Sequence, residues 1–264
     1  MSIVPLSEAD CYETPDDLPL PLRMKFTFYN RWWFYSKFIR IILDYRSTCL
    51  KNLGSDEKWV KASLQVLKVI ESCGGRFTIN GLDNLRKVKE PVVIISNHMS
   101  TMETMVFPIV IFPFIPITFV VKESLIKGQI FGPVMRSRKP VAVGRVNPRK
   151  DFETVLVEGT KILEKGISLI IFPQATRRVS FEPENFNSLG VKLAKRAGVK
   201  AVPAALKTDF WGNGKKLLKD FGPIDPSKRI YMSFGEPMII EGNGKDQHQK
   251  SIEFIQSHLE KWKD

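Results

Sequence analysis

Short uncharged runs alternate with longer amphipathic stretches along most of the chain. The clearest run is Val-Val-Ile-Ile at 92–95, which breaks at Ser96-Asn97, as a buried parallel strand does at its carboxyl end. Comparable runs predict further strands at 117–121, 141–143, 168–172, 200–206 and 229–234. Helical spacing of apolar residues predicts helices over 151–165, 185–197 and 247–261. Strands that alternate with helices predict an α/β fold with a mostly parallel sheet flanked by helices.

One stretch, 104–121, carries no charged residue over 18 positions, which is long enough for a membrane span. Pro108, Pro113 and Pro116 argue against one straight helix, because each proline removes a backbone donor. We therefore predict a short helix that ends near Phe107, an apolar loop and the strand at 117–121. Two interpretations of the apolar surface stay open: it is ordinary core, or it lines a channel for a fatty chain or dips into a bilayer.

The first 74 residues differ in composition from the rest. Residues 1–21 form an acidic arm, in which positions 1–20 hold five acids and neither Lys nor Arg. The arm lacks the basic start and the apolar stretch of a secretory signal, and we expect it to be extended and disordered. Residues 22–74 are predicted to form a pair of helices, and residues 75–264 form the main domain.

The first helix of the pair, over 22–51, combines many aromatic and aliphatic residues with seven basic residues and a single acid, Asp44. Trp32 and Trp33 among basic neighbours are typical of an interfacial membrane anchor, and the charges interrupt the stretch too often for a bilayer span. Each basic residue near an anionic surface contributes on the order of 1 kcal/mol. The alternative is an aromatic helix packed on the domain. Nucleic-acid binding also uses basic and aromatic residues, but so much Ile, Leu and Phe suits lipid better.

Overall charge and cysteine content indicate the class of partner and the redox compartment of the protein. A formal net charge of +12 indicates an anionic partner, namely a membrane surface, an acidic substrate or nucleic acid, unless it is only a solvated basic surface. The three cysteines are scattered and odd in number, which fits a reducing compartment and suggests neither a disulfide framework nor a metal site. Of the three histidines only His98 follows a predicted strand, whereas His248 and His258 lie in a polar C-terminal stretch.

His98 and Glu103 are the candidate catalytic pair. Both follow the strand at 92–95, and open α/β sheets bind their ligands at the carboxyl ends of strands. A carboxylate that fixes an imidazole in one tautomer makes that histidine a positioned general base. Residues five apart on one helix point about 140° away from each other, so the pair meets only if His98 precedes the helix and Glu103 lies in its first turns. By itself the pair equally fits a capped helix start with a structural histidine.

Distinctive residues accompany four of the predicted strands. They are Asn97-His98-x4-Glu103, Gly144-Arg145, Phe172-Pro173-Gln174-Ala175-Thr176-Arg177 and Val202-Pro203-Ala204-Ala205. In order and spacing these blocks resemble the glycerolipid acyltransferase family, best known for the 1-acylglycerol-3-phosphate acyltransferases. The family pattern is His-x4-Asp, an arginine-bearing block, Glu-Gly-Thr-Arg and a Val-Pro block, and the resemblance covers about residues 75–240.

The resemblance implies an acyltransferase at the cytoplasmic face of a membrane, peripheral or monotopic, with anionic lipid and no nucleic acid as partner. His98 would be the general base for an acceptor hydroxyl, and Glu103 would orient it. The implied substrate-binding residues are Arg145, Thr176, Arg177, Gln174 and Asn97, with the two arginines at the family's phosphate-binding positions. The implied acceptor is lysophosphatidate or a related lysophospholipid. The implied donor is an acyl thioester of coenzyme A or acyl-carrier protein, with no metal and no bound cofactor.

Two blocks depart from the family pattern. Glu103 stands where the family has Asp, which preserves the charge but demands another rotamer or a small helix shift. Gln174-Ala175 replaces Glu-Gly, which removes a negative charge beside the acceptor site and restricts the backbone. Three rival functions stay open: a hydrolase or phospholipid transacylase that uses the same residues, a non-catalytic lipid-binding relative, and a basic nucleic-acid binder. The sequence holds no Gly-x-Ser-x-Gly elbow, which argues against a serine esterase.

Overall fold

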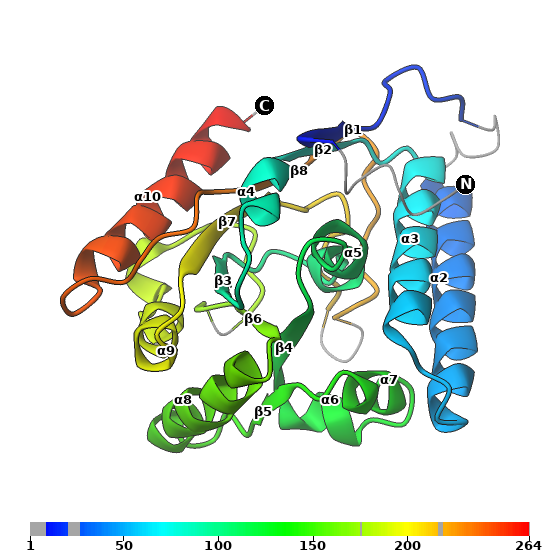
Figure 1. Cartoon of the computed structure of the whole chain (residues 1–264). Helices are drawn as coiled ribbons and strands as arrows, with labels where there is room; N and C mark the ends of the chain where they lie inside the picture. The colour runs from blue at the N-terminus through cyan, green and yellow to red at the C-terminus, as the bar shows by residue number, and fades with distance from the viewer. Residues whose placement is uncertain (1–8, 21–26, 175, 216–218, 264) are drawn as a thin grey trace.

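An eight-stranded sheet lies at the centre of the computed structural model, which describes residues 9–20, 27–174, 176–215 and 219–263 (Figure 1). The strands are β1 Cys11–Glu13, β2 Phe77–Asn80, β3 Val93–Ser96, β4 Ile117–Lys122, β5 Val141–Val143, β6 Ser168–Ile171, β7 Ala201–Lys207 and β8 Ile230–Phe234. Their order across the sheet is β1-β2-β8-β7-β3-β6-β4-β5. Neighbours pair in parallel except at β1–β2 and β7–β8, so the prediction of a mostly parallel sheet is confirmed.

Helices cover both faces of this sheet. They are α2 Thr27–Leu50, α3 Asp56–Ser72, α4 Leu82–Arg86, α5 Met102–Ile111, α6 Glu123–Lys127, α7 Gly132–Ser137, α8 Pro148–Glu164, α9 Leu189–Ala197 and α10 Lys245–Lys261, with a 3₁₀ turn at Pro183–Asn185. Ile94 of β3 belongs to the core shared with α2, α3 and α5. Val93 and Ile95 belong to the core on the opposite face, shared with α8, α9 and α10. The uncharged run of β3 therefore reflects burial on both faces.

Five strands, β7, β3, β6, β4 and β5, run parallel side by side, so their carboxyl ends meet at one edge of the sheet. The loop after β3 carries His98, the loop after β6 carries Gln174 and Arg177, and Thr208 follows β7. β3 lies between β6 and β7. Three adjacent strands thus bring these side chains to one edge.

The acidic arm is ordered where the structure describes it. β1 pairs antiparallel with β2 at the edge of the sheet. Arg229 forms ion pairs with Glu13 and Asp16, at 2.7 and 2.6 Å. The expectation of disorder therefore does not hold for residues 9–20, because strand pairing and these charges fix the segment. Residues 1–8 and 21 of the predicted arm lie outside the described residues.

α2 and α3 form the predicted helical pair, except that residues 22–26 lie outside the described residues. Phe34 and Phe38 of α2 are buried and pack edge-on against Trp211, with ring centroids 4.8 and 4.9 Å apart. One face of α2 is therefore packed on the domain, whereas Trp32 on the other face is exposed. Within the described ranges no helix combines the length and the apolar character that crossing a bilayer requires.

α5 continues to Ile111 through Pro108, four residues beyond the predicted end. The hydroxyl of Ser63, from α3, is inserted into the helix at this point: it accepts from the backbone N–H of Ile109 at 3.0 Å and donates to the carbonyl of Met105 at 2.7 Å. Side chains inserted in this way replace regular bonds of the helical ladder. The predicted end was wrong because the Ser63 hydroxyl replaces helical hydrogen bonds that Pro108 disrupts, and the helix therefore continues past the proline.

The rest of the uncharged stretch 104–121 is mostly ordinary core. Val106, Ile109, Ile117 and Phe119 are all buried in the core shared with α2 and α3. The interpretation as core therefore accounts for most of its apolar residues.

Candidate active site

His98 and Glu103 meet at the carboxyl end of β3. His98 lies in the loop before α5 and Glu103 lies in the first turn of α5, which is the arrangement that their spacing requires. Nδ1 of His98 is 2.9 Å from Oε1 of Glu103. A proton on Nδ1 satisfies this contact and leaves Nε2 as the acceptor for another proton. The His98 side chain is 18% exposed and that of Glu103 is fully buried, so the imidazole alone is accessible.

The buried carboxylate of Glu103 accepts five hydrogen bonds. Oε1 accepts from His98 and from the backbone N–H groups of Met99 and Ser100, the latter two at 2.7 and 2.9 Å. Oε2 accepts from the hydroxyls of Ser100 and Thr208, at 2.9 and 2.8 Å. Burial alone raises the pKa of this carboxyl, but the contacts with His98 and the backbone N–H groups outweigh burial and hold the pKa below its ordinary value. Glu103 is therefore a carboxylate at neutral pH.

The local sequence explains how a glutamate reaches back to this loop. Ser100-Thr101-Met102-Glu103 has the Ser-x-x-Glu spacing of a capping box, a motif in which serine and glutamate satisfy free backbone N–H groups at a helix start, and the N-cap of α5 is Thr101 within it. The Ser100 hydroxyl accepts from the N–H of Met102 at 3.1 Å, and Glu103 accepts from the N–H of Ser100. The cap therefore fixes the longer side chain in the rotamer that also contacts His98.

The loop after β6 fixes the other side of His98. The ring of Phe172 stacks on the imidazole, with centroids 4.2 Å apart and an interplanar angle of 19°. Oε1 of Gln174 accepts from the backbone N–H of His98, and the backbone N–H of Arg178 donates to the His98 carbonyl, both at 2.9 Å. Gln174 is buried and thus positions the loop that carries His98. Ala175, the other residue of the altered block, lies outside the described residues.

Arg177 forms an ion pair at the same edge. Its Nη1 atom donates to the hydroxyl of Thr101 and lies 2.6 Å from Oδ1 of Asp220. The Thr101 hydroxyl donates to the same carboxylate oxygen at 2.9 Å. A guanidinium carries five N–H donors, so Arg177 keeps donors with which to bind a phosphate. Asp220 offsets part of its positive charge.

Asn97 joins two strands. Its Nδ2 atom donates to the carbonyl of Leu206, and its Oδ1 atom accepts from the N–H of Leu206, both at 2.8 Å. The side chain is 2% exposed. Asn97 thus fastens the end of β3 to β7, and its predicted contact with substrate stays a prediction.

Arg145 lies apart from the pair, and Thr176 has no contact with it among the described hydrogen bonds. Arg145 follows β5, which is three strand spacings from β3, or about 14 Å. Its backbone adopts the left-handed conformation, with φ of 59°, and its N–H donates to Oδ2 of Asp151 at 2.7 Å. Thr176 is exposed, and its backbone N–H donates to the Gln174 carbonyl. Contacts of these two side chains with substrate stay predictions.

Three further residues hold the site, and no local pattern in the sequence indicates them. Thr208 binds Glu103, Asp220 binds Arg177, and Nδ2 of Asn213 donates to the carbonyl of Met99 at 2.8 Å. All three belong to the segment between β7 and β8, far along the chain from His98. Only the adjacent strands bring them together, whereas the role of Ser100 is visible in its Ser-x-x-Glu motif.

Residues 76–207, half of the chain, match the acyltransferase family. The 1-acyl-sn-glycerol-3-phosphate acyltransferase of Pseudomonas aeruginosa is 31% identical over 232 residues, which cover 88% of this chain and 82% of that protein. The protein of the same name from Borreliella burgdorferi is 27% identical over 134 residues, which cover 50% of this chain and 52% of that protein. The crystal structure of the 1-acyl-sn-glycerophosphate acyltransferase PlsC from Thermotoga maritima shares the fold, with a TM-score of 0.65 and 19% identity, covering 91% of this chain and 97% of that one. This chain belongs to the acyltransferase family.

Proposed function

We propose that this protein is an O-acyltransferase that moves a fatty acyl group from an acyl thioester to the hydroxyl of lysophosphatidate or a related lysophospholipid. The observation that carries the proposal is the His98–Glu103 pair at the carboxyl end of β3, in a chain of the acyltransferase family. The relatives from P. aeruginosa and B. burgdorferi support the acceptor class, because both are named for acylation of 1-acyl-sn-glycerol-3-phosphate.

In the proposed reaction, Nε2 of His98 takes the proton of the acceptor hydroxyl as that oxygen attacks the thioester carbonyl carbon. The new C–O bond forms, the C–S bond breaks, and the proton on His98 passes to the departing sulfur, which leaves as a thiol. Glu103 stabilises the imidazolium between the two proton transfers. General-base catalysis of this kind contributes about 10²–10⁴-fold to the rate. Coenzyme A or acyl-carrier protein is the co-substrate, with no metal and no bound cofactor.

The phosphate of the acceptor binds at the same edge of the sheet. Arg177 contacts the phosphate through N–H donors other than the one that binds Asp220. Thr176, the exposed residue just before Arg177, contributes its hydroxyl to the same phosphate. Arg145, farther along the edge, adds a second positive charge. Gln174 stands where the family pattern has an acid, so one negative charge beside the acceptor is missing. The headgroup is therefore the part of the acceptor whose identity is most open.

The exposed face of α2 supports membrane attachment. Trp32, Ile39, Leu43 and Leu50 are 62, 41, 45 and 52% exposed. At about 100° per residue these four positions fall within about 20° of one line along the helix, opposite the buried Phe34. A helix that is apolar on two opposite faces needs a second apolar environment besides the domain. We assign that environment to the interfacial layer of a bilayer.

The helix pair then holds the enzyme on the cytoplasmic face of a membrane that contains anionic lipid. The net charge of +12 favours an anionic surface, and three free cysteines fit the reducing side of the membrane.

Thiol release tests the chemistry. Acyl-CoA is supplied with a panel of lysophospholipids in vesicles, and we expect acylation of at least one acceptor with release of one thiol per product. His98→Ala should abolish this reaction while the protein stays folded. Thiol release without an acceptor would indicate a hydrolase, acyl exchange without a thioester would indicate a transacylase, and lipid binding without turnover would indicate a non-catalytic relative.

Vesicle flotation tests the attachment. Salt should release only part of the protein, because charges are screened within about 10 Å at 0.1 M whereas apolar burial is not. Trp32→Ser with Leu43→Ser should release nearly all of it. Val146→Ser with Ile239→Ser is the matched control, because these residues are 91 and 65% exposed and lie outside α2. Equal release by both double variants would refute the assignment of the α2 face.

A further inference from the structure

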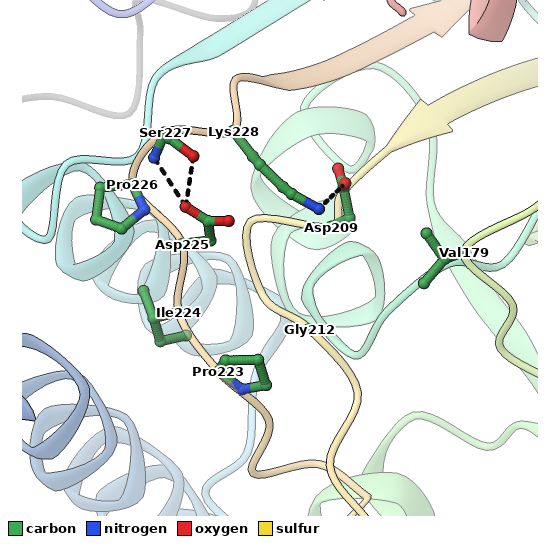
Figure 2. A pocket seen from close by; sticks show the side chains of 9 residues that line it. All are labelled: Val179, Asp209, Gly212, Pro223, Ile224, Asp225, Pro226, Ser227 and Lys228. Atoms are coloured by element: carbon green, nitrogen blue, oxygen red, sulfur yellow. Dashed lines mark hydrogen bonds and ion pairs between the residues drawn. The ribbon is translucent and has the colours of Figure 1, made fainter. Parts of the chain in front are cut away.

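A groove of about 500 Å³ lies where the chain leaves β7 and returns to β8 (Figure 2). It is bounded by the two chain segments that follow β7 and precede β8, with Val179 facing them from the loop after β6. Its apolar lining includes Val179, Pro223 and Ile224, and its polar lining includes Asp209, Ser227 and Lys228. None of these six residues takes part in the proposed proton transfers.

The walls of the groove are joined to the catalytic residues. Asp209 directly follows Thr208, whose hydroxyl binds Glu103. Gly212, also in the lining, precedes Asn213, which binds the carbonyl of Met99 next to His98. A ligand in this groove therefore lies against the same loops that hold the catalytic pair.

The segments after β7 and before β8 form one fixed wall of the groove, because backbone hydrogen bonds join them to each other. The N–H of Gly212 donates to the carbonyl of Pro223, and the N–H of Asp225 donates to the carbonyl of Phe210, both at 2.9 Å. A wall fixed in this way loses little entropy of its own when a ligand binds.

Asp209 is the residue that points to a ligand. Its Oδ2 atom is 2.7 Å from Nζ of Lys228, and its side chain is 10% exposed. Its Oδ1 atom is buried and has no hydrogen-bond partner within the described part of the chain. A buried acceptor left without a donor destabilises the fold, so this position suits a ligand N–H or O–H. The ammonium of Lys228 brings hydrogen-bond donors to the same place, as Figure 2 shows.

We propose that this groove binds the pantetheine arm of the acyl thioester donor, an inference that rests on the proposed function. Pantetheine is a narrow chain with two amides and a dimethyl-substituted carbon. An amide N–H of the arm donates to Asp209, an amide carbonyl accepts from Lys228, and the dimethyl carbon packs on the apolar wall. The arm is about as long as four extended residues, roughly 14 Å, which suits a ligand that passes Asp209 and ends with its thioester beside His98.

A lysophospholipid headgroup fits the groove less well. Common headgroups are short and polar, so they satisfy Asp209 but leave the apolar wall at Val179, Pro223 and Ile224 uncovered. Coenzyme A and acyl-carrier protein both present the pantetheine arm, so the groove serves either donor.

Two pairs of variants test the proposal. Val179→Trp narrows the groove, and because Val179 is 57% exposed the fold accommodates the larger ring; Val179→Ala is its control. Asp209→Asn replaces the carboxylate that accepts the ligand N–H. Its control is Asp225→Asn, an equal charge change in the same groove at a carboxylate whose Oδ1 atom already accepts from Ser227.

Calorimetric titration with desulfo-coenzyme A gives a dissociation constant that does not depend on turnover. We expect Val179→Trp and Asp209→Asn each to raise it about tenfold or more, and the two controls to leave it within about twofold of wild type. The KM of the lysophospholipid acceptor should stay unchanged in all four variants. If acyl-carrier protein is the second source of the arm, the variants should bind holo-carrier protein more weakly by the same factor as desulfo-coenzyme A. Apo-carrier protein lacks the arm, so its affinity should be the same for wild type and variants.

A rise in the acceptor KM with unchanged desulfo-coenzyme A binding would assign the groove to the acceptor and overturn the proposal. Unchanged binding of both ligands would do the same. Because desulfo-coenzyme A binds without reacting, failure of acyl transfer in the wild-type protein would count against the proposed function and not against the groove.

Discussion

We expect Glu103 to act through its charge and through the length of its side chain, and two substitutions separate these properties. Glu103→Gln keeps the length of the side chain and removes its charge. Glu103→Asp keeps the charge and removes one methylene, which withdraws the carboxylate by about 1.5 Å. The family pattern has Asp at this position, so the chemistry tolerates the shorter acid in principle. In this loop, we expect the shorter acid to lower kcat without abolishing activity.

The five hydrogen bonds set the size of the effect in Glu103→Asp. One carboxylate oxygen faces His98 and two backbone N–H groups, and the other faces the hydroxyls of Ser100 and Thr208, all at 2.7–2.9 Å. Withdrawal by about 1.5 Å takes at least one oxygen beyond hydrogen-bond distance. A lost hydrogen bond to a charged group costs about 1.5–3 kcal/mol, which corresponds to about 10- to 100-fold in kcat.

The effect of Glu103→Gln follows from the charge. At about 4 Å and an effective dielectric constant of about 20, the carboxylate and an imidazolium attract each other by about 4 kcal/mol. Loss of this attraction lowers kcat by up to about 10³-fold. The hydroxyls of Ser100 and Thr208 can rotate to accept from the new amide, so the geometry survives.

Thiol release at saturating substrate measures kcat for both variants, and thermal unfolding verifies that each is folded. We expect wild type to be fastest, Glu103→Asp slower by about 10- to 100-fold, and Glu103→Gln slowest. Wild-type kcat in Glu103→Asp would refute the argument from reach. Wild-type kcat in Glu103→Gln would refute the role of the charge.

Three further predictions concern Arg177, pH and Trp211. Arg177→Ala should raise the acceptor KM about tenfold or more without changing the donor KM. Asp220→Asn should lower the acceptor KM, because it removes a carboxylate that competes with the phosphate for Arg177. Equal changes in the KM of both substrates would contradict phosphate binding by Arg177. The pKa of Glu103 lies below its ordinary value of 4.5, so ionised Glu103 stabilises the fold above that pH and loses this contribution as pH falls further. The difference in thermal stability between wild type and Glu103→Gln should therefore shrink below pH 4.5. Trp211→Ala should lower the free energy of unfolding by about 3–5 kcal/mol in urea denaturation, because the ring supports Phe34 and is fully buried.

The meeting of His98 and Glu103 was predictable because it depends on local sequence. An apolar run predicts the strand, the break after it predicts the loop, and the Ser-x-x-Glu motif marks the start of the next helix. The same reasoning brings Gln174 and Arg177 to this edge, since both follow a neighbouring parallel strand.

The rest of the site depends on contacts that local patterns do not encode. Thr208 reaches Glu103 only because β7 pairs with β3, and Asp220 reaches Arg177 only through the loop that follows β7. The antiparallel pairing of β7 with β8 likewise leaves no mark in the period of apolar residues. Ion pairs between Arg229 and two acids hold the arm, although its composition alone favours disorder.

The hydroxyl of Ser63 has a consequence for the order in which the protein folds. It lies 42 and 46 residues from Met105 and Ile109, the positions that it joins within α5. An isolated helix of ten residues is unstable in water, and a proline within it weakens it further. The helix that carries Glu103 therefore becomes stable only after α3 has docked. The N-terminal helices thus serve as a template for the His98–Glu103 pair during folding, and a chain that lacks them is expected to lose the contact between these two side chains.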